Sequence, residues 1–294
     1  MTQRPPSPAL DQLNKKRRFK DRLLWGIAAC ALIVIVIPII WIISQVVSKA
    51  IPHMSMSVLL TNTIGNGGGL KQAIVGSITL LVLVGAIAGV TGIGAGIYIA
   101  RYAPRAIAGF LRSTVEILAG VPSIVVGFVG YIALVVGSHW SFSIWAATIV
   151  LSAMVVPYIA KATEVSLRGV SDSLREAGEA IGLRDSLVLR KILIKSASPG
   201  IVTGFILALA ISVGETAPLL YTAGWSTTSP TFSLKHSPIG YLTYPVWTFY
   251  DFPVKSASYL ALEAAMLLII LVIALIALAH LLRHKLSKNL PQSL

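Results

Sequence analysis

The chain has 294 residues, of which 55% are hydrophobic and only 12% are charged. A soluble domain carries about 25% charged residues, so this composition excludes a protein whose whole surface faces water. The formal net charge is +13, and a single cysteine excludes an intrachain disulfide and a cysteine-based metal cluster. Several apolar runs exceed the roughly 18 residues that indicate a membrane-spanning helix. We therefore expect an all-α polytopic membrane protein.

The positions of the basic residues argue against nucleic acid as a partner. Of the 24 lysines and arginines, seven precede Leu23, three lie in residues 101–112, seven in residues 161–195, and three follow Leu282. Basic residues gathered on alternate loops follow the positive-inside rule of membrane proteins. We expect the lipid bilayer of the cell (inner) membrane as the environment, with these four segments in the cytoplasm.

In chain order, residues 1–22 are a basic, proline-containing tail that we expect to be flexible and to touch anionic headgroups. The apolar run after it is longer than the h-region of a cleaved signal, about 7–15 residues, so we interpret it as a first span. Six spans are predicted, at about 23–47, 73–100, 117–137, 142–160, 200–223 and 258–282. Both termini are then cytoplasmic, and the basic clusters share one side.

The third predicted span begins with Gly120-Val121-Pro122-Ser123. Because Pro122 has no N–H, the Leu118 carbonyl loses its helical partner. In lipid that carbonyl must be satisfied by another helix, by a hydroxyl such as that of Ser123, or by water in a cavity. A structural kink and a place on a solute pathway both remain open.

A polar, charge-dense segment separates the fourth and fifth spans. Ser173 and Glu176 have capping-box spacing, which predicts a helix from about Leu174. Gly182 suits the end of that helix, where the chain reverses. A second helix is expected from Asp185 toward residue 196, followed by entry into the fifth span at residues 199–200.

Along the first of these helices, Leu174, Ala177 and Ile181 form a narrow apolar stripe with charged flanks. Such a helix suits a groove on another protein. A solvated loop helix is the alternative that physics alone leaves open.

The segment from Glu176 to Gly182, EAGEAIG, is followed after nine residues by Ile192-Leu193-Ile194. This pattern resembles the EAA motif of binding-protein-dependent ABC importer permeases. The resemblance implies a type I ABC importer permease (MetI-like) architecture and a coupling helix held in a cleft of the ATPase. The residues implied in coupling are Arg175, Glu176, Ala177, Glu179, Gly182 and Arg184. Two positions depart from the motif: Gly178 replaces an alanine, which we expect to soften the helix, and Lys195 replaces a proline.

Two further segments, residues 120–127 (GVPSIVVG) and 213–220 (VGETAPLL), resemble the phosphate-specific importer permeases, and the second resembles the PstA-type subunit. An arginine commonly stands four residues before the glutamate in those relatives, whereas this chain has Ile211.

Glu215 lies about fifteen residues into the fifth span, where a carboxylate costs several kcal/mol unless it is paired, protonated or hydrated. Without a cation at Ile211, its partner must come from another helix or subunit. We expect it to orient a cationic group that binds the anion, and a structural anchor between helices is the alternative. Pro218 should free a backbone carbonyl at the same level. The residues predicted on the pathway are Pro122, Ser123, Glu215, Thr216 and Pro218.

The resemblance implies a non-catalytic permease subunit that moves inorganic phosphate. Its implied partners are a second permease (PstC-like), an ATPase dimer (PstB-like) and an extracytoplasmic phosphate-binding protein (PstS-like). ATP and magnesium belong to the ATPase, since this chain has no GxxxxGK[ST] loop, and we expect no cofactor or metal on it. A permease for another oxyanion or phosphorylated solute is the alternative. A membrane enzyme is disfavoured because the five histidines lack metal-ligand spacing.

The predicted organisation has four parts. They are the basic cytoplasmic tail (1–22), the first span with its outer loop (23–72), the permease domain (73–285, with the coupling region at 171–199), and a cytoplasmic C-terminal tail (286–294).

Overall fold

The computed structural model describes residues 8–288, and the chain divides into two compact units, Met1–Pro52 and His53–Leu294. In the first unit, α1 runs from Pro8 to Ala50 as one helix of 43 residues. The predicted flexible tail is therefore wrong for residues 8–22, where Pro8 occupies a helix start, the position at which its missing N–H costs no bond. Residues 1–7 of that tail, and residues 289–294 of the predicted C-terminal tail, lie outside the described part.

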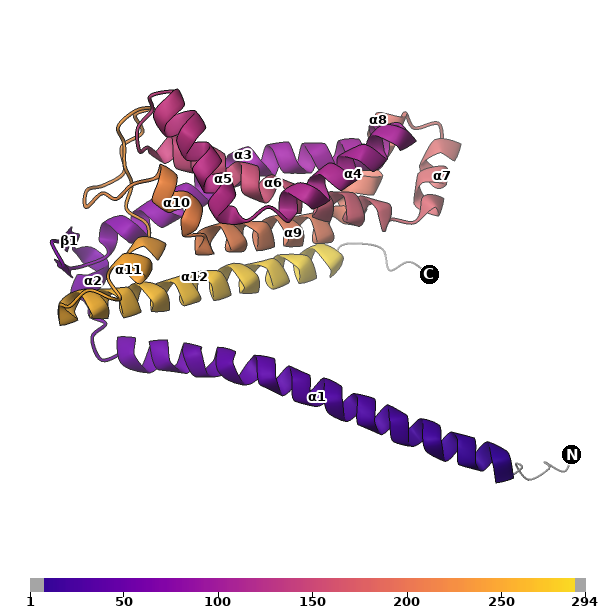
Figure 1. The fold of residues 1–294 in the computed structure, drawn as a ribbon. Coiled ribbons are helices and arrows are strands. Elements are labelled where there is room, and N and C mark those ends of the chain that lie inside the picture. The colour runs from indigo at the N-terminus through magenta and orange to yellow at the C-terminus, as the bar shows by residue number, and fades with distance from the viewer. Residues whose placement is uncertain (1–7, 289–294) are drawn as a thin grey trace, which may run out of the picture. The chain divides into compact units, whose positions relative to one another are not determined.

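The second unit is built on four helices, α3 (Lys71–Ile97), α6 (Ile144–Arg168), α9 (Ile194–Gly214) and α12 (Lys255–Lys288), drawn in Figure 1. A π-helical turn, η1 (Tyr98–Tyr102), extends α3. Glycines of α3 form the contacts: a Cβ at Gly92 would lie 2.7 Å from the Ile159 side chain, and one at Gly96 2.5 Å from Thr163. The absence of side chains there lets α3 and α6 pack closely.

Five helices of the described chain are long and apolar enough to cross a membrane: Lys20–Ala50, Lys71–Tyr102, Ile144–Arg168, Asp185–Gly214 and Lys255–Lys288. A sixth span is counted only if α4 (Arg105–Ala119) and the helical stretch Ser123–Gly137 form one broken span, bent by 94°. That stretch consists of α5 (Ser123–Gly130) and the π-helical η2 (Tyr131–Gly137). The third span was predicted as a single helix from residue 117, but its first three residues belong to α4.

The segment between α6 and α9 contains α7 (Asp172–Ala180), α8 (Asp185–Leu187) and the π-helical η3 (Val188–Leu193). The last two continue into α9 as one helix, so the predicted separation near residue 196 is wrong. Pro199 stands inside this helix, and the Ser198 hydroxyl donates to the Lys195 carbonyl at 2.7 Å. That is the carbonyl whose helical N–H partner Pro199 lacks, so the serine compensates for the proline.

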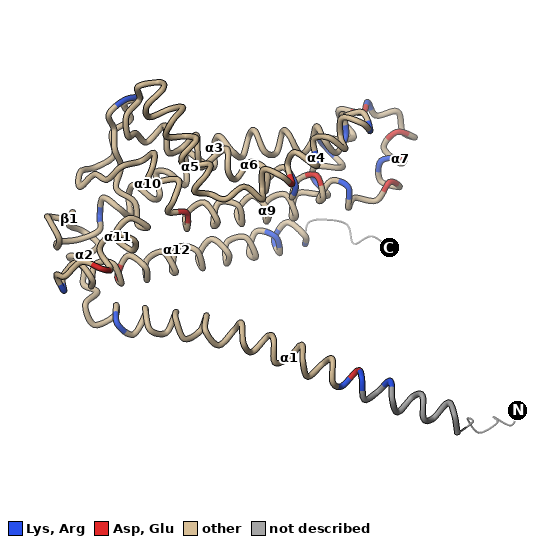
Figure 2. Tube along the Cα trace, viewed as in Figure 1, with Lys and Arg blue, Asp and Glu red and all other residues tan. Residues whose placement is uncertain are grey.

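The predicted fifth span ends early, at Gly214, and the chain resumes as α10 (Ala217–Thr222). At the end of the unit away from α7 lie the short helices α2 (Met56–Leu60) and α11 (Thr243–Thr248), together with the antiparallel pair β1 (Thr63–Ile64) and β2 (Gly67–Gly68) (Figure 1). Charged residues gather toward the α7 end of the unit, while the middle of the bundle carries very few (Figure 2). This distribution fits the predicted segregation of basic residues.

Candidate functional site

The helix α7 begins two residues earlier than the capping-box spacing predicts. Its N-cap is Ser171, whose hydroxyl accepts a hydrogen bond from the Ser173 N–H at 3.3 Å. Ser173 bonds instead to the Ser171 hydroxyl, at 2.7 Å. Asp172 then stands in the first turn, where a carboxylate interacts favourably with the helix dipole.

The end of α7 confirms the prediction for Gly182, which has a φ of 77°. Its N–H donates to the Glu179 carbonyl at 2.9 Å, and the Leu183 N–H donates to the Gly178 carbonyl at 3.2 Å. These two bonds make a complete Schellman motif, which reverses the chain and requires the left-handed residue that glycine supplies.

Gly178 is the point at which α7 packs on η3. It is buried, and a Cβ there would lie 2.9 Å from Ile192 and 3.1 Å from Val188. We expected this departure from the motif to soften the helix. The structure shows that the glycine instead forms the close contact between α7 and the helix that continues into α9.

Much of the rest of α7 is exposed. Leu174 and Ile181 are 43% and 75% exposed, and Glu176 and Ala177 are also exposed. Arg175 pairs with Glu179 at 3.4 Å. Arg184 is exposed directly before α8, so the six residues predicted for coupling all lie on one tip of the molecule. The apolar stripe predicted from the sequence has no cover within the described chain and offers a contact surface with acidic flanks.

The first of two helix breaks lies at residues 120–122, between α4 and α5. The Leu118 carbonyl accepts from the Val121 N–H at 3.3 Å, and the Ala119 carbonyl accepts from the Tyr158 hydroxyl of α6 at 2.9 Å. The prediction that another helix, a hydroxyl such as that of Ser123, or water would satisfy the Leu118 carbonyl is therefore wrong, because a backbone N–H of the same turn does so. The hydroxyl of Tyr158, from another helix, bonds to the neighbouring carbonyl of Ala119 instead.

The second break contains Glu215, in extended conformation between α9 and α10. Thr216 is the N-cap of α10, and Pro218 lies in the first turn of that helix, where its missing N–H costs no bond. The Thr243 hydroxyl donates to the Glu215 carbonyl at 3.1 Å. Pro218 therefore lies at the start of a new helix. The helix break itself is at Glu215, three residues before the proline.

The two breaks meet in space. A Cβ at Gly127 would lie 2.6 Å from the Pro218 Cα, so the backbones of α5 and α10 are in direct contact. The Ser123 hydroxyl approaches the Glu215 carboxylate. Pro122, Ser123, Glu215, Thr216 and Pro218, predicted from two distant segments, are thus brought together, although Pro218 itself is buried.

Among residues 53–288 of the second unit, no lysine, arginine or histidine forms an ion pair with Glu215. Ile211, where relatives carry a cation, is 42% exposed on α9. Within this described unit, a hydroxyl, that of Ser123, is the polar side chain next to the carboxylate.

A family model described as the inner membrane component of binding-protein-dependent transport systems matches residues 92–288. This stretch is more than half of the chain and includes α7 and both helix breaks. The chain belongs to this permease family. The permease is 49% identical over 275 residues to "Phosphate transport system permease protein PstA 2" of Mycobacterium bovis, covering 94% of this chain and 91% of that protein. It is 38% identical over 219 residues to PstA of Yersinia pestis, covering 72% and 74%.

Among solved structures, an inward-facing form of the MetNI methionine ABC transporter matches with a TM-score of 0.59 at 22% identity. The match covers 74% of the permease and 97% of that chain. At this identity the likeness concerns the fold, and it confirms the expected MetI-like architecture.

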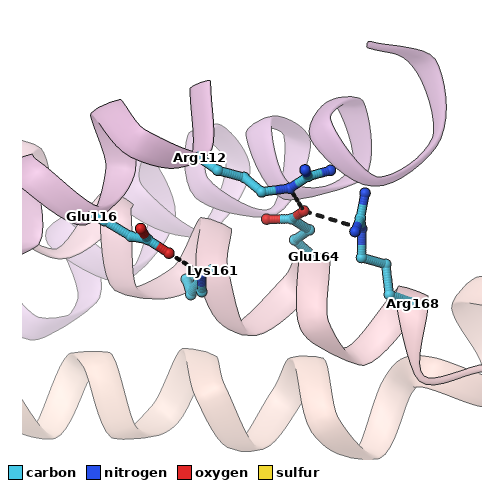
Figure 3. A network of polar contacts seen from close by, with 5 residues as sticks. All are labelled: Arg112, Glu116, Lys161, Glu164 and Arg168. Atoms are coloured by element: carbon cyan, nitrogen blue, oxygen red, sulfur yellow. Dashed lines mark hydrogen bonds and ion pairs between the residues drawn. The ribbon is translucent and has the colours of Figure 1, made fainter. Parts of the chain in front are cut away.

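An ion-pair network of the permease, which sequence reasoning missed, joins α4 to α6 (Figure 3). Glu164, with a side chain only 4% exposed, lies between Arg112 of α4 and Arg168, the latter at 3.1 Å. Nearby, Lys161 pairs with Glu116 of α4. Because α4 leads directly into the break before Pro122, these pairs fix the approach to the break. The i,i+4 spacing of Glu164 and Arg168 was visible in the sequence, but nothing there indicated the pairing with Arg112.

Proposed function

We propose that this permease is the transmembrane subunit of an ATP-driven ABC importer that moves inorganic phosphate into the cytoplasm. The observation that carries the proposal is the 49% identity, over 94% of the chain, to a phosphate transport system permease. In the proposed topology both termini are cytoplasmic, and α4 with α5 is the third of six spans. The α7 end then faces the cytoplasm, and the α11 end faces an extracytoplasmic binding protein.

In this assembly the exposed face of α7 docks in a cleft of an ATPase subunit, and a second permease completes the pathway. Leu174, Ala177 and Ile181 supply an apolar stripe, and Glu176 supplies charge for recognition. ATP and magnesium are held by the ATPase dimer. The permease itself contributes movement and no chemical step.

The movement has a direct mechanical route. Through Gly178, α7 packs on η3, and η3 is part of the helix Asp185–Gly214. Thirty residues of helix are about 45 Å long. A displacement of α7 is therefore delivered at the far end of that helix, next to Glu215, where the two breaks meet.

At this junction the carboxylate of Glu215 would repel an anion, so we do not assign it as a direct ligand of the charged phosphate oxygens. It is suited to hold a cationic group of the second permease, which then binds the anion, or to accept the hydrogen of HPO4²⁻ or H2PO4⁻. The hydroxyls of Ser123 and Thr216 lie at the same level and can donate to phosphate oxygens.

The test is uptake of labelled phosphate into vesicles that contain the complete assembly, with unlabelled sulfate, molybdate and glycerol 3-phosphate as competitors. We expect ATP-dependent uptake that only phosphate and close analogues such as arsenate reduce. If the vesicles show no ATP-dependent uptake of labelled phosphate but take up labelled sulfate, molybdate or glycerol 3-phosphate, the substrate is a different oxyanion or a phosphorylated solute.

A further inference from the structure

An open cleft of about 850 Å³ lies beside the start of α7. It is bounded by the end of α6, the start of α7, and the helix formed by η3 and α9. Its polar lining consists of two lysines and four serines: Lys191, Lys195, Ser166, Ser171, Ser173 and Ser196. Leu174 of the apolar stripe lines the cleft, whereas Glu176, Ala177 and Ile181 do not, so the cleft adjoins the proposed ATPase contact.

The two lysines give the cleft its charge. Lys191 and Lys195 are four residues apart on one helix face, and both are exposed. Like charges at this spacing destabilise a helix. Elsewhere in this region Lys161, Arg168 and Arg175 each have an acidic partner. In the part of the chain that the structure describes, neither lysine of the cleft is within 4 Å of a carboxylate.

The distance from the membrane favours a soluble anion over a lipid headgroup. About 20 residues of helix cross the hydrocarbon, so α6 leaves it near Thr163 if it enters at Ile144. A Cβ built on Gly200 would lie 2.3 Å from the hydroxyl oxygen of Ser166. Gly200 of α9 therefore lies at the same depth in the membrane as Ser166 of α6. Lys195 and Lys191 then lie roughly 12 and 18 Å beyond the hydrocarbon, outside a headgroup layer about 5–8 Å thick.

We propose that this cleft binds a soluble phosphate group, with Lys191 and Lys195 as the charged ligands and Ser171, Ser173 and Ser196 as hydroxyl donors. Ammonium groups and hydroxyls are donors that suit phosphate oxygens. The assignment of free phosphate, the product of transport, rests on the proposed function, which also places the α7 end in the cytoplasm. Because the ligands come from both α7 and the η3–α9 helix, bound phosphate clamps α7 to that helix and makes transport sensitive to the product.

The test is binding of inorganic phosphate to the full chain purified in detergent, measured by calorimetry, for the wild type, K191Q/K195Q and R190Q. Arg190 is exposed, is adjacent in sequence and does not line the cleft, so R190Q is the matched control for loss of charge. We expect the double substitution to weaken phosphate binding tenfold or more, since it removes two charge-assisted contacts, and R190Q to leave binding unchanged. Phosphate held at the Glu215 junction would be insensitive to both changes, and thermal unfolding without phosphate should be the same in all three proteins.

Equal phosphate binding by the three proteins, or none at 10 mM phosphate, would overturn the proposal. A parallel arm uses dioctanoyl-phosphatidylglycerol, with dioctanoyl-phosphatidylcholine as the neutral control. Lysine-dependent binding of the anionic lipid, without binding of inorganic phosphate, would overturn the soluble anion in favour of a headgroup. None of these outcomes depends on transport, so a failure here and a failure of the proposed function are distinguishable.

Discussion

Substitution of Gly127 by alanine tests whether contact between the two helix breaks is needed for transport. The added Cβ would lie 2.6 Å from the Pro218 Cα, 3.2 Å from the Pro218 nitrogen and 3.3 Å from the Ala217 carbonyl oxygen. All three neighbours are backbone atoms, so no side-chain rotation relieves the clash. The helix α5 must withdraw from α10 by about 0.8 Å to reach an ordinary contact distance, and Ser123 moves away from Glu215 with it.

Overpacking of this kind costs about 1–3 kcal/mol, which corresponds to a fivefold to hundredfold loss of the state in which the breaks touch. We expect G127A to lower the thermal unfolding temperature in detergent and to reduce phosphate uptake by a similar factor. The matched control is G94A in α3, where a Cβ would meet nothing within 4 Å. There alanine should be neutral or should stabilise the helix by up to about 1 kcal/mol.

Both readouts are needed to interpret the result. If G127A matches G94A in unfolding temperature and in uptake, then the contact between α5 and α10 is not as close as described. The account of a junction held by two helix breaks would then be refuted. Reduced stability with full uptake would show instead that the contact is structural and lies outside the pathway.

Three further predictions concern the network, the docking face and the first break. Removing the charge of the buried Glu164 (E164Q) weakens its bonds to two partly exposed arginines and should destabilise the permease by about 1–2 kcal/mol, measured by unfolding in detergent, while E116Q at the exposed pair should have little effect. Charge reversal at Glu176 (E176K) should abolish phosphate uptake while ATP hydrolysis by the assembly continues. Removing the hydroxyl of Tyr158 (Y158F) leaves the Ala119 carbonyl unpaired and should cost about 1 kcal/mol in the same unfolding assay.

Each of these predictions has an outcome that contradicts it. If E116Q destabilises as much as E164Q, burial does not determine the strength of the network. Wild-type uptake by E176K would remove α7 from the coupling role, and the same substitution type at the exposed Asp251, D251K, is a control for charge alone. An unchanged unfolding temperature for Y158F would mean that water satisfies the carbonyl.

The sequence was sufficient for the class, for the long helices and for the position of the docking helix. Gly182 predicted the reversal after α7, because that reversal depends on local backbone geometry. The N-cap was misplaced by two residues because Ser171 and Ser173 are equally good caps. The sequence also predicted a helix end near residue 196, since Pro199 normally interrupts a helix, and compensation by Ser198 could not be anticipated from a propensity.

What could not be predicted are contacts between segments distant in the chain. The pairing of Glu164 with Arg112, the bond from Tyr158 to Ala119 and the approach of Thr243 to Glu215 depend on the fold as a whole. Gly127 lies within the segment that resembles the phosphate-specific importer permeases, but the reason for a glycine there is the contact with Pro218, which the sequence does not show.

The close packing of α7 at Gly178 limits which sequence segments can be exchanged between related transporters. A heptapeptide transplanted from another importer would usually bring an alanine to position 178, where Val188 and Ile192 leave it too little room. We therefore expect a functional chimera to need residues 171–192 from one parent protein, so that α7 and the residues that pack against Gly178 match each other. The segment that must be exchanged to change the proposed ATPase partner is accordingly longer than the EAA-like motif itself.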